Sequence, residues 1–213
     1  RLDEKKNIIG VVKAFAESDT LRMKARLVIC IRGIDDPYLD IDTLPDAEKT
    51  VLREILDVID HADMATRVSY LNIQSQRELA ATYRYLADRG SVFALTAFYE
   101  PFGLAPIEAA ACGLACVATQ NGGPSEIFED GSGILVDPFD ASAIAVGLVS
   151  ALDRQGDLSE RARQRVLNMY TWEKTADSYI DVIRKGISAN RESDGKFPEL
   201  NAENRIVNYL HGI

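Results

Sequence analysis

The sequence has 213 residues, of which 46% are hydrophobic and 27% charged, the composition of an ordinary globular protein with room for one large domain. Its 24 Lys and Arg are scattered and are outnumbered by 33 Asp and Glu, for a net charge of −9, which argues against nucleic acid as a partner. The N-terminus is charged and no run approaches the ~20 apolar residues that span a bilayer, so we expect a cytoplasmic protein without a membrane partner.

Helical and strand patterns alternate along the chain. A helical pattern at residues 6–18 places Ile9, Val12 and Ala16 on one face, and a short apolar run of buried-strand type follows at residues 26–31. Strands separated by helices pair in parallel through right-handed crossovers. The pattern therefore predicts an α/β, Rossmann-like, doubly wound parallel sheet. Its further elements are helices at residues 46–61, 75–87, 106–112, 124–128, 141–152, 159–170 and 172–187, and strands at residues 67–71, 91–95, 115–118 and 134–136.

Two segments interrupt this alternation. Residues 32–45 are rich in Asp, Pro and Gly and predict a long loop after a strand. Residues 188–204 are polar and contain Gly and Pro, which predicts a mobile tether before a short amphipathic segment near the C-terminus. We therefore expect a domain over residues 1–187, followed by a tether and tail over residues 188–213.

The loop after the strand at residues 91–95 is the strongest candidate for a ligand site, because open parallel sheets bind ligands beyond the carboxyl ends of their strands. It reads TAFYEPFGLAPIEAAACG, in which Gly103 allows a close backbone approach and Pro106 suits a first helical turn. The backbone amides of Phe102, Gly103 and Leu104 then lie near a helix N-terminus. Unsatisfied amides and the helix dipole favour an anion such as phosphate there.

Charged side chains accompany this loop. Glu100 and Glu108 flank the anion position, and carboxylates accept hydrogen bonds from neighbouring sugar hydroxyls. Taken singly, Glu108 is better explained by the helix dipole and Glu100 by solvation; the complete string EPFGLAPIE favours a ligand site. Arg1 and Lys6 stand close enough in sequence to face the same phosphates, although the pair taken alone is better explained as a solvated N-terminal cluster. Two explanations fit the turn at residues 122–124 about equally well: it forms a wall of the ligand pocket, or it only reflects the ordinary preference of Gly and Pro for turns.

Several of these segments together resemble a known family. RLDEKKN, GSVFALTAFYEPFGLAPIEAAACG, NGGPSEI, GILVDP and YTW resemble the C-terminal half of retaining GT-B glycosyltransferases. Within that group the sequence is similar to bacterial sucrose-phosphate synthases and mannosylfructose-phosphate synthases. The resemblance covers residues 1–187 and implies the C-terminal, donor-binding domain of a GT-B fold.

The resemblance also implies roles for individual residues. Arg1 and Lys6 would bind the donor diphosphate and stabilise it as a leaving group, as developing negative charge requires. Glu100 would bind hydroxyls of the donor sugar, and Glu108 would hold the ribose hydroxyls. The backbone amides of Phe102, Gly103 and Leu104 would reach the sugar and the phosphates. Gly33 and residues 70–79 would lie near the nucleotide base.

The implied substrates are a nucleotide diphosphate sugar and a sugar-phosphate acceptor. UDP-glucose and GDP-mannose both remain open as donors, and fructose 6-phosphate is the implied acceptor. No cofactor and no resident metal are expected, and any Mg²⁺ would act through the phosphates. The N-terminal domain of the family and the strand that should precede Arg1 are absent from this sequence, so we expect nucleotide binding without sugar transfer.

Other functions are compatible with the same residues. Glu100 and Glu108 could be the acid and nucleophile of a retaining glycosidase, which would require their carboxyl groups within about 5–5.5 Å of each other. Related chemistries on the same fold are trehalose-type or glycogen-type synthesis and nucleotide-sugar epimerisation. A non-catalytic module that binds nucleotide sugars is the alternative from another class.

Overall fold

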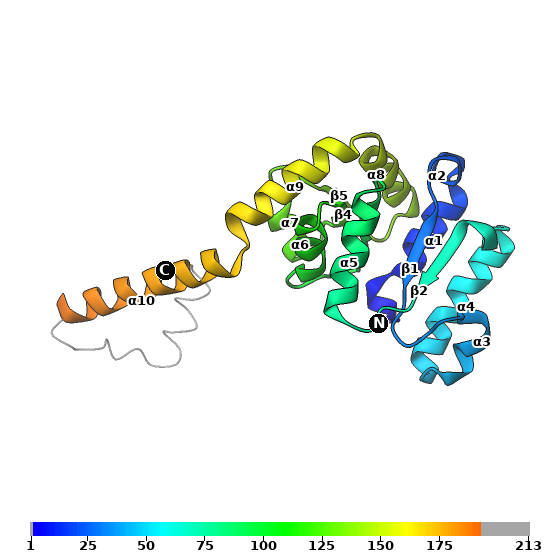
Figure 1. Cartoon of the computed structure of the whole chain (residues 1–213), viewed down its shortest axis with the longest axis horizontal. Helices are drawn as coiled ribbons and strands as arrows, with labels where there is room; N and C mark the ends of the chain where they lie inside the picture. Colours follow the sequence, from blue (N-terminus) through cyan, green and yellow to red (C-terminus); the bar gives the residue numbers. More distant parts are fainter. Residues whose placement is uncertain (1, 193–213) are drawn as a thin grey trace. The chain divides into compact units, whose positions relative to one another are not determined.

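The structure, a computed structural model, describes residues 2–192. It divides into two compact units, the first ending at Asn168 and the second beginning at Met169. The first unit contains every strand of the described residues (Figure 1). Of the second unit, the structure describes the helix α10 (Trp172–Glu192), in which Tyr179, Ile180, Ile183 and Ile187 recur at the spacing of one helical face. Residues 193–213, with most of the predicted tether and the whole predicted tail segment, lie outside the described residues.

The first unit alternates helices and strands as the sequence predicts. All of its strand pairs are parallel, so the α/β class with parallel strands is confirmed. The strands are β1 (Leu27–Cys30), β2 (Val68–Leu71), β3 (Val92–Leu95), β4 (Ala115–Thr119) and β5 (Ile134–Val136). The α-helices are α1 (Ile8–Glu17), α2 (Asp19–Lys24), α3 (Pro37–Asp40), α4 (Asp46–His61), α5 (Gln76–Ala87), α6 (Leu104–Ala111), α7 (Gly123–Ile127), α8 (Ala141–Asp153) and α9 (Gln155–Met169). Short 3-10 helices are η1 (Glu4–Lys6), η2 (Ile41–Thr43) and η3 (Ala65–Arg67).

The strands form two sheets instead of the single sheet predicted. β1 pairs with β2, and β3, β4 and β5 pair in that order. One hydrophobic core nevertheless serves both sheets, because it contains Ile29 of β1, Val68 of β2 and Val117 of β4. Helix α1 contacts both α4 and α8.

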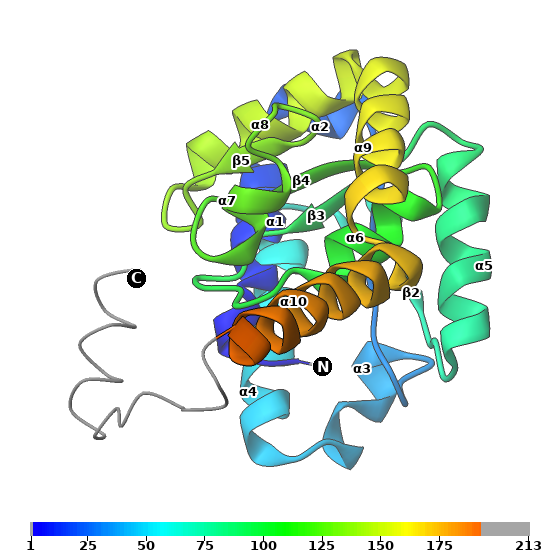
Figure 2. The same cartoon turned by 90° about the vertical axis from the view of Figure 1, so that its left-hand side faces the viewer.

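Helices cover both faces of the sheet formed by β3, β4 and β5 (Figure 2). Because side chains alternate along a strand, Ala115 and Val117 of β4 face the main core, where α8 packs. Cys116 points to the other face, and its thiol contacts the carbonyl oxygen of Pro106 in α6. β4 is buried at every position, as the centre of a covered parallel sheet should be.

Several predicted boundaries are wrong, among them the start of α9 at Gln155 instead of residue 159, and four differences have a clear local reason. The first helix begins at Ile8 instead of residue 6, because Asn7 adopts a left-handed conformation with φ of 51°. α6 begins at Leu104, before Pro106, because Gly103 caps it with a φ of 80°. The predicted loop at residues 32–45 contains α3 and η2, and α3 is capped by the carboxylate of Asp36. α10 continues through residues 188–192, which the sequence assigned to the tether.

Candidate functional site

The N-terminal segment and the loop after β3 meet through a charged pair. The ammonium Nζ of Lys6 lies 2.8 Å from Oε2 of Glu100, although the two residues are far apart in sequence. The side chain of Glu100 is 13% exposed and that of Lys6 is 43% exposed, so the pair borders solvent. The structure therefore brings together two of the residues that the sequence singled out as candidates.

Asn7 fixes the position of Lys6. It is almost fully buried, and its amide nitrogen donates to the carbonyl oxygens of Thr96 at 3.0 Å and Pro138 at 2.7 Å. Its amide oxygen accepts the backbone N–H of Gly10, which caps the start of α1. Because a left-handed backbone costs asparagine less than most residues, Asn7 can turn the chain from η1 into α1 at this point. Lys6 consequently lies in η1, and the prediction that it begins a helix is wrong.

Glu100 accepts hydrogen bonds from two directions. Besides Lys6, the backbone N–H of Gly103 donates to its Oε1 at 3.3 Å. Burial by itself would raise the pKa of Glu100, but the hydrogen bonds from Lys6, Gly103 and Phe102, together with the charge of Lys6, hold that pKa below its usual value. The carboxylate is therefore ionised near neutral pH. It occupies the amide-rich position at the start of α6 that the sequence predicted would attract an anion.

The start of α6 places the remaining loop candidates. Phe102 and Leu104 are 77% and 65% exposed on either side of buried Gly103. Glu108 is exposed on α6, in its second turn instead of the predicted first turn, because the helix begins at Leu104. Pro106 is tolerated in the first turn, where backbone N–H groups have no partner within the helix.

α7 forms one wall of this loop through very close backbone contacts. The N–H of Glu100 donates to the carbonyl oxygen of Asn121 at 3.1 Å, and the N–H of Gly123 donates to the carbonyl oxygen of Glu100 at 2.9 Å. A Cβ atom on Gly122 would lie 2.2 Å from that same carbonyl oxygen, and Gly122 has a φ of 102°. The turn at residues 122–124 therefore does more than reverse the chain, since it is interlocked with the loop that carries Glu100.

The carboxyl ends of β1 and β2 present a second group of candidates. Gly33 has a φ of 83°, and a Cβ atom added to it would meet nothing within 4 Å. Its N–H donates to Oδ1 of Asn72 at 2.8 Å, and the Asn72 amide donates to Oδ1 of Asp35 at the same distance. Asn72, which lies in the segment at residues 70–79, thus ties the loops after both strands together.

Arg1 lies outside the described residues. Within residues 2–192 no cluster of three or more His, Cys, Asp or Glu side chains is arranged to hold a metal ion. In the same range, no helix has both the length and the apolar character needed to cross a bilayer.

Sequence reasoning missed Asn7 and Arg165, and it included Asn72 only within the segment at residues 70–79, without a role of its own. Asn7 directly follows a candidate lysine, and an Asn in a helical pattern is a weak signal for a break or cap. Asn72 follows a strand, where such a residue could have been suspected. Arg165 contacts backbone atoms of α7 from α9, and no local pattern marks that contact.

Comparison with known proteins gives one consistent result. The family model described as glycosyl transferases group 1 matches residues 1–169. Sucrose-phosphate synthase 4 from Arabidopsis thaliana is 37% identical over 186 residues, which are 86% of this chain and 17% of that protein. The chain therefore spans about a sixth of the length of this plant relative.

Solved structures agree on the fold. A sucrose-phosphate synthase from Thermosynechococcus elongatus matches with a TM-score of 0.69 and 26% identity, over 89% of this chain and 44% of that one. HepE from Anabaena, solved in complex with UDP and glucose, matches with a TM-score of 0.68 and 17% identity, over 87% of this chain and 46% of that one.

Proposed function

The chain belongs to the group 1 glycosyl transferases and has the fold of a GT-B C-terminal domain, and on that premise we propose that it binds the nucleotide-sugar donor of a retaining hexosyltransferase. The donor-binding domain comprises residues 1–187. Its donor is UDP-glucose or GDP-mannose, and its acceptor is a sugar phosphate such as fructose 6-phosphate. The likeness to sucrose-phosphate synthases supports this choice of acceptor.

The contact between Lys6 and Glu100 is the observation that carries the proposal. It joins a cation and an anion at the N-terminus of α6, where the amide of Gly103 also points. A diphosphate needs cationic and N–H donors, whereas a sugar needs carboxylate acceptors. All three kinds of group meet at this one place.

Each group has a separate role when the donor binds. Lys6 moves from Glu100 to the diphosphate and, together with Arg1, stabilises the charge that develops as the glycosidic bond breaks. Glu100 accepts hydrogen bonds from the sugar hydroxyls, and the amides of residues 102–104 reach the sugar and phosphates. Glu108 holds the ribose, and Gly33 borders the base. Any Mg²⁺ is held through the phosphates.

The ionisation of Glu100 argues against this residue as the general acid of a glycosidase. A glycosidase needs one protonated carboxyl group as general acid, with a raised pKa. The pKa of Glu100 is lowered instead, which suits a hydrogen-bond acceptor for hydroxyl groups. Departure of the donor phosphate assists attack by the acceptor from the same face, so neither glutamate has to form a covalent bond.

Calorimetric titration with UDP and with GDP tests the site. We expect binding of one of them, and we expect Lys6→Ala to weaken it by about tenfold to a hundredfold, the value of a charge-assisted hydrogen bond. Glu108→Ala should weaken binding through loss of the ribose contact. Uridine or guanosine without phosphates should be insensitive to Lys6→Ala.

Matched controls are available on neighbouring helices. Lys13 in α1 and Glu54 in α4 are exposed, so Lys13→Ala and Glu54→Ala make the same charge changes away from the site. Both controls should bind like the unmodified chain. Unchanged affinity in both Lys6→Ala and Glu108→Ala would refute the proposed site.

A further inference from the structure

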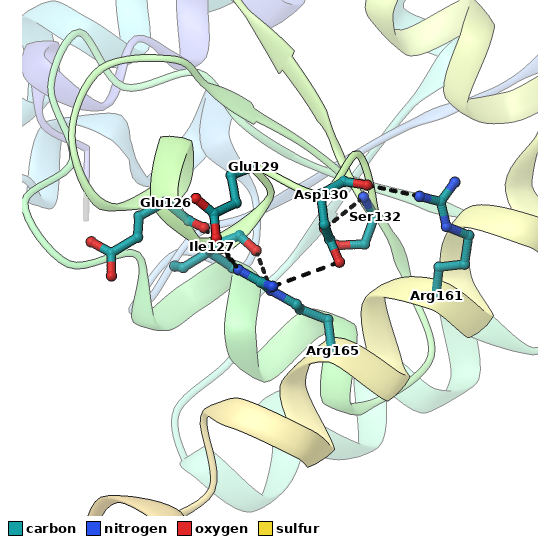
Figure 3. A network of polar contacts seen from close by, with 7 residues as sticks. All are labelled: Glu126, Ile127, Glu129, Asp130, Ser132, Arg161 and Arg165. Carbon is teal, nitrogen blue, oxygen red and sulfur yellow. Dashed lines mark hydrogen bonds and ion pairs between the residues drawn. The ribbon is translucent and has the colours of Figure 1, made fainter. Parts of the chain in front are cut away.

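Arg165 of α9 holds the C-terminal end of α7 (Figure 3). Its Nε donates to the carbonyl oxygen of Ile127 at 3.1 Å, and its Nη2 donates to the carbonyl oxygen of Glu126 at 3.2 Å. Its side chain is only 17% exposed. The last carbonyl groups of a helix have few backbone donors, and although that of Glu126 also accepts the N–H of Glu129 at 3.4 Å, a guanidinium with several N–H groups suits this place.

The same guanidinium also contacts two carboxylates beyond α7. Nη2 lies 2.9 Å from Oε1 of Glu129 and Nη1 lies 3.8 Å from Oδ2 of Asp130. Arg161, one turn earlier on α9, donates to the carbonyl oxygen of Asp130 at 2.9 Å. Figure 3 shows both arginines reaching from α9 toward this segment. Residues 126–130 are therefore fixed by backbone and side-chain contacts together.

α7 transmits this constraint to the loop that carries Glu100. The helix is short, so its two ends are close: Arg165 holds one end, and Gly122 and Gly123 are interlocked with Glu100 and Phe102 at the other. Ile127 is buried, and a Cβ atom added to Gly103 would lie 2.7 Å from its Cδ1. A shift of α7 would therefore displace the carboxylate of Glu100 or the start of α6.

We propose that Arg165 is a positioning residue, which holds α7 against the loop of Glu100 and Gly103 and thereby sets the geometry of the donor site. Its effect on ligand binding rests on the proposed function, whereas its effect on the loop does not. A guanidinium makes several directed contacts at once, which a single ammonium cannot reproduce. Arg165→Lys should therefore restore only part of what Arg165→Gln removes.

Amide hydrogen exchange of the ligand-free 213-residue chain tests the effect on the loop. The amides of Glu100, Gly103 and Gly123 report on it, since all three donate within the interlocked region. Arg165→Gln should accelerate their exchange by about tenfold, or about 1.4 kcal/mol of local opening. The Ile31 amide, bonded to Leu71 beside the β1–β2 pair, should be unaffected. Arg163→Gln, an exposed change on the same helix, is the control.

A double-mutant cycle with UDP-glucose, or with GDP-mannose if GDP is the nucleotide that binds, tests the effect on the site. Arg165→Gln should weaken binding by about tenfold in the unmodified chain and have little effect in a Glu100→Gln background, because Arg165 acts on the site through the position of Glu100 and residues coupled through a shared backbone shift are not additive. Equal effects in both backgrounds, or unchanged exchange at Glu100, Gly103 and Gly123, would overturn the inference. If neither sugar nucleotide binds the unmodified chain, the proposed function fails and the exchange measurement alone decides the role of Arg165.

Discussion

Two polar residues, Asn7 and Glu100, determine the local geometry of the candidate site. Asn7 uses its buried amide to join the N-terminal segment to the loops after β3 and β5. The carboxylate of Glu100 accepts hydrogen bonds from both the Lys6 ammonium and the backbone N–H of Gly103. Each residue is placed by contacts with partners far away in sequence, so a substitution at either one should affect more than its own side chain.

The lowered pKa of Glu100 predicts a pH dependence of stability. A carboxyl group with a lower pKa in the folded chain than in the unfolded chain stabilises the fold above the unfolded pKa. That contribution is lost as the pH falls through the folded pKa. Urea unfolding from about pH 7 down to about pH 3 should therefore show a smaller loss of unfolding free energy in Glu100→Gln than in the unmodified chain.

The control for this pH series is Glu54→Gln, an exposed change on α4 that should leave the acid dependence as it is. Asp130, whose pKa is also lowered through Ser132, Arg165 and Arg161 despite its partial burial, contributes in the same direction. An acid dependence that is identical in Glu100→Gln and the unmodified chain would contradict the proposed environment of Glu100.

Asn7→Ala should destabilise the chain by about 3 kcal/mol, because it leaves two buried carbonyl oxygens without donors. Asn7→Gly removes the same hydrogen bonds but accepts the left-handed backbone, so it should cost about 1 kcal/mol less. Urea unfolding measures both values. Asn168→Ala, at an exposed position on α9, should lie within about 0.5 kcal/mol of the unmodified chain. Equal stability of Asn7→Ala and Asn168→Ala would contradict the role of Asn7.

At the level of elements, α7 and the loop at residues 100–103 behave as one interlocked piece. Glycines permit this, because backbone atoms of the two segments approach more closely than a Cβ atom would allow. Gly122 shows this most clearly, since its φ of 102° and the carbonyl oxygen of Glu100 both exclude a side chain.

Gly122→Ala should therefore lower the unfolding free energy by about 2 kcal/mol or more and should weaken nucleotide binding, because the loop must move. Gly156→Ala in α9 is the matched substitution, since nothing lies within 4 Å of the added atom. In a helix this change should be neutral or stabilising by up to about 1 kcal/mol. Similar stability losses in the two variants, measured by thermal unfolding, would show that the contact with Glu100 is unimportant.

Regular elements were predictable from local pattern, whereas the contacts that assemble the site were not. The bounds predicted for α4 and β5 agree with the structure, because periodicity and turn residues are encoded locally. The starts of α1 and α6 were misplaced, since Asn7 and Gly103 set them through backbone conformation. The interaction of Arg165 with α7 joins residues from different elements, and only the folded chain shows it.

For the whole first unit, the prediction of an α/β fold with parallel strands is confirmed, but the sheet is divided in two. Strand patterns predict which segments are extended, but they do not predict which strands are hydrogen-bonded to each other in a sheet. The core nevertheless spans both sheets through α1, so the loops after β1 and β3 belong to the same unit. This supports a site that takes groups from both.

Because the chain covers less than half of a solved relative, we expect it to bind the sugar donor without transferring the sugar. It covers 44% of the solved synthase from Thermosynechococcus elongatus, and we propose that the acceptor is bound by a part of the whole protein outside these residues. Residues 1–213 alone should bind a nucleotide sugar without transferring hexose to fructose 6-phosphate. Formation of a phosphorylated disaccharide by the purified chain, detected by mass spectrometry, would contradict this.

The location of the donor site is the central claim, and an amide NMR titration of the chain with UDP and GDP tests it most directly. The largest shifts should fall on Lys6, Gly103 and Leu104, with a second group at Gly33 and Asn72 near the base. Shifts confined to another surface, such as the groove between α1, α2 and α8 lined by Ser18, Ala145 and Ser150, would contradict the claim. So would the absence of any shift at millimolar nucleotide.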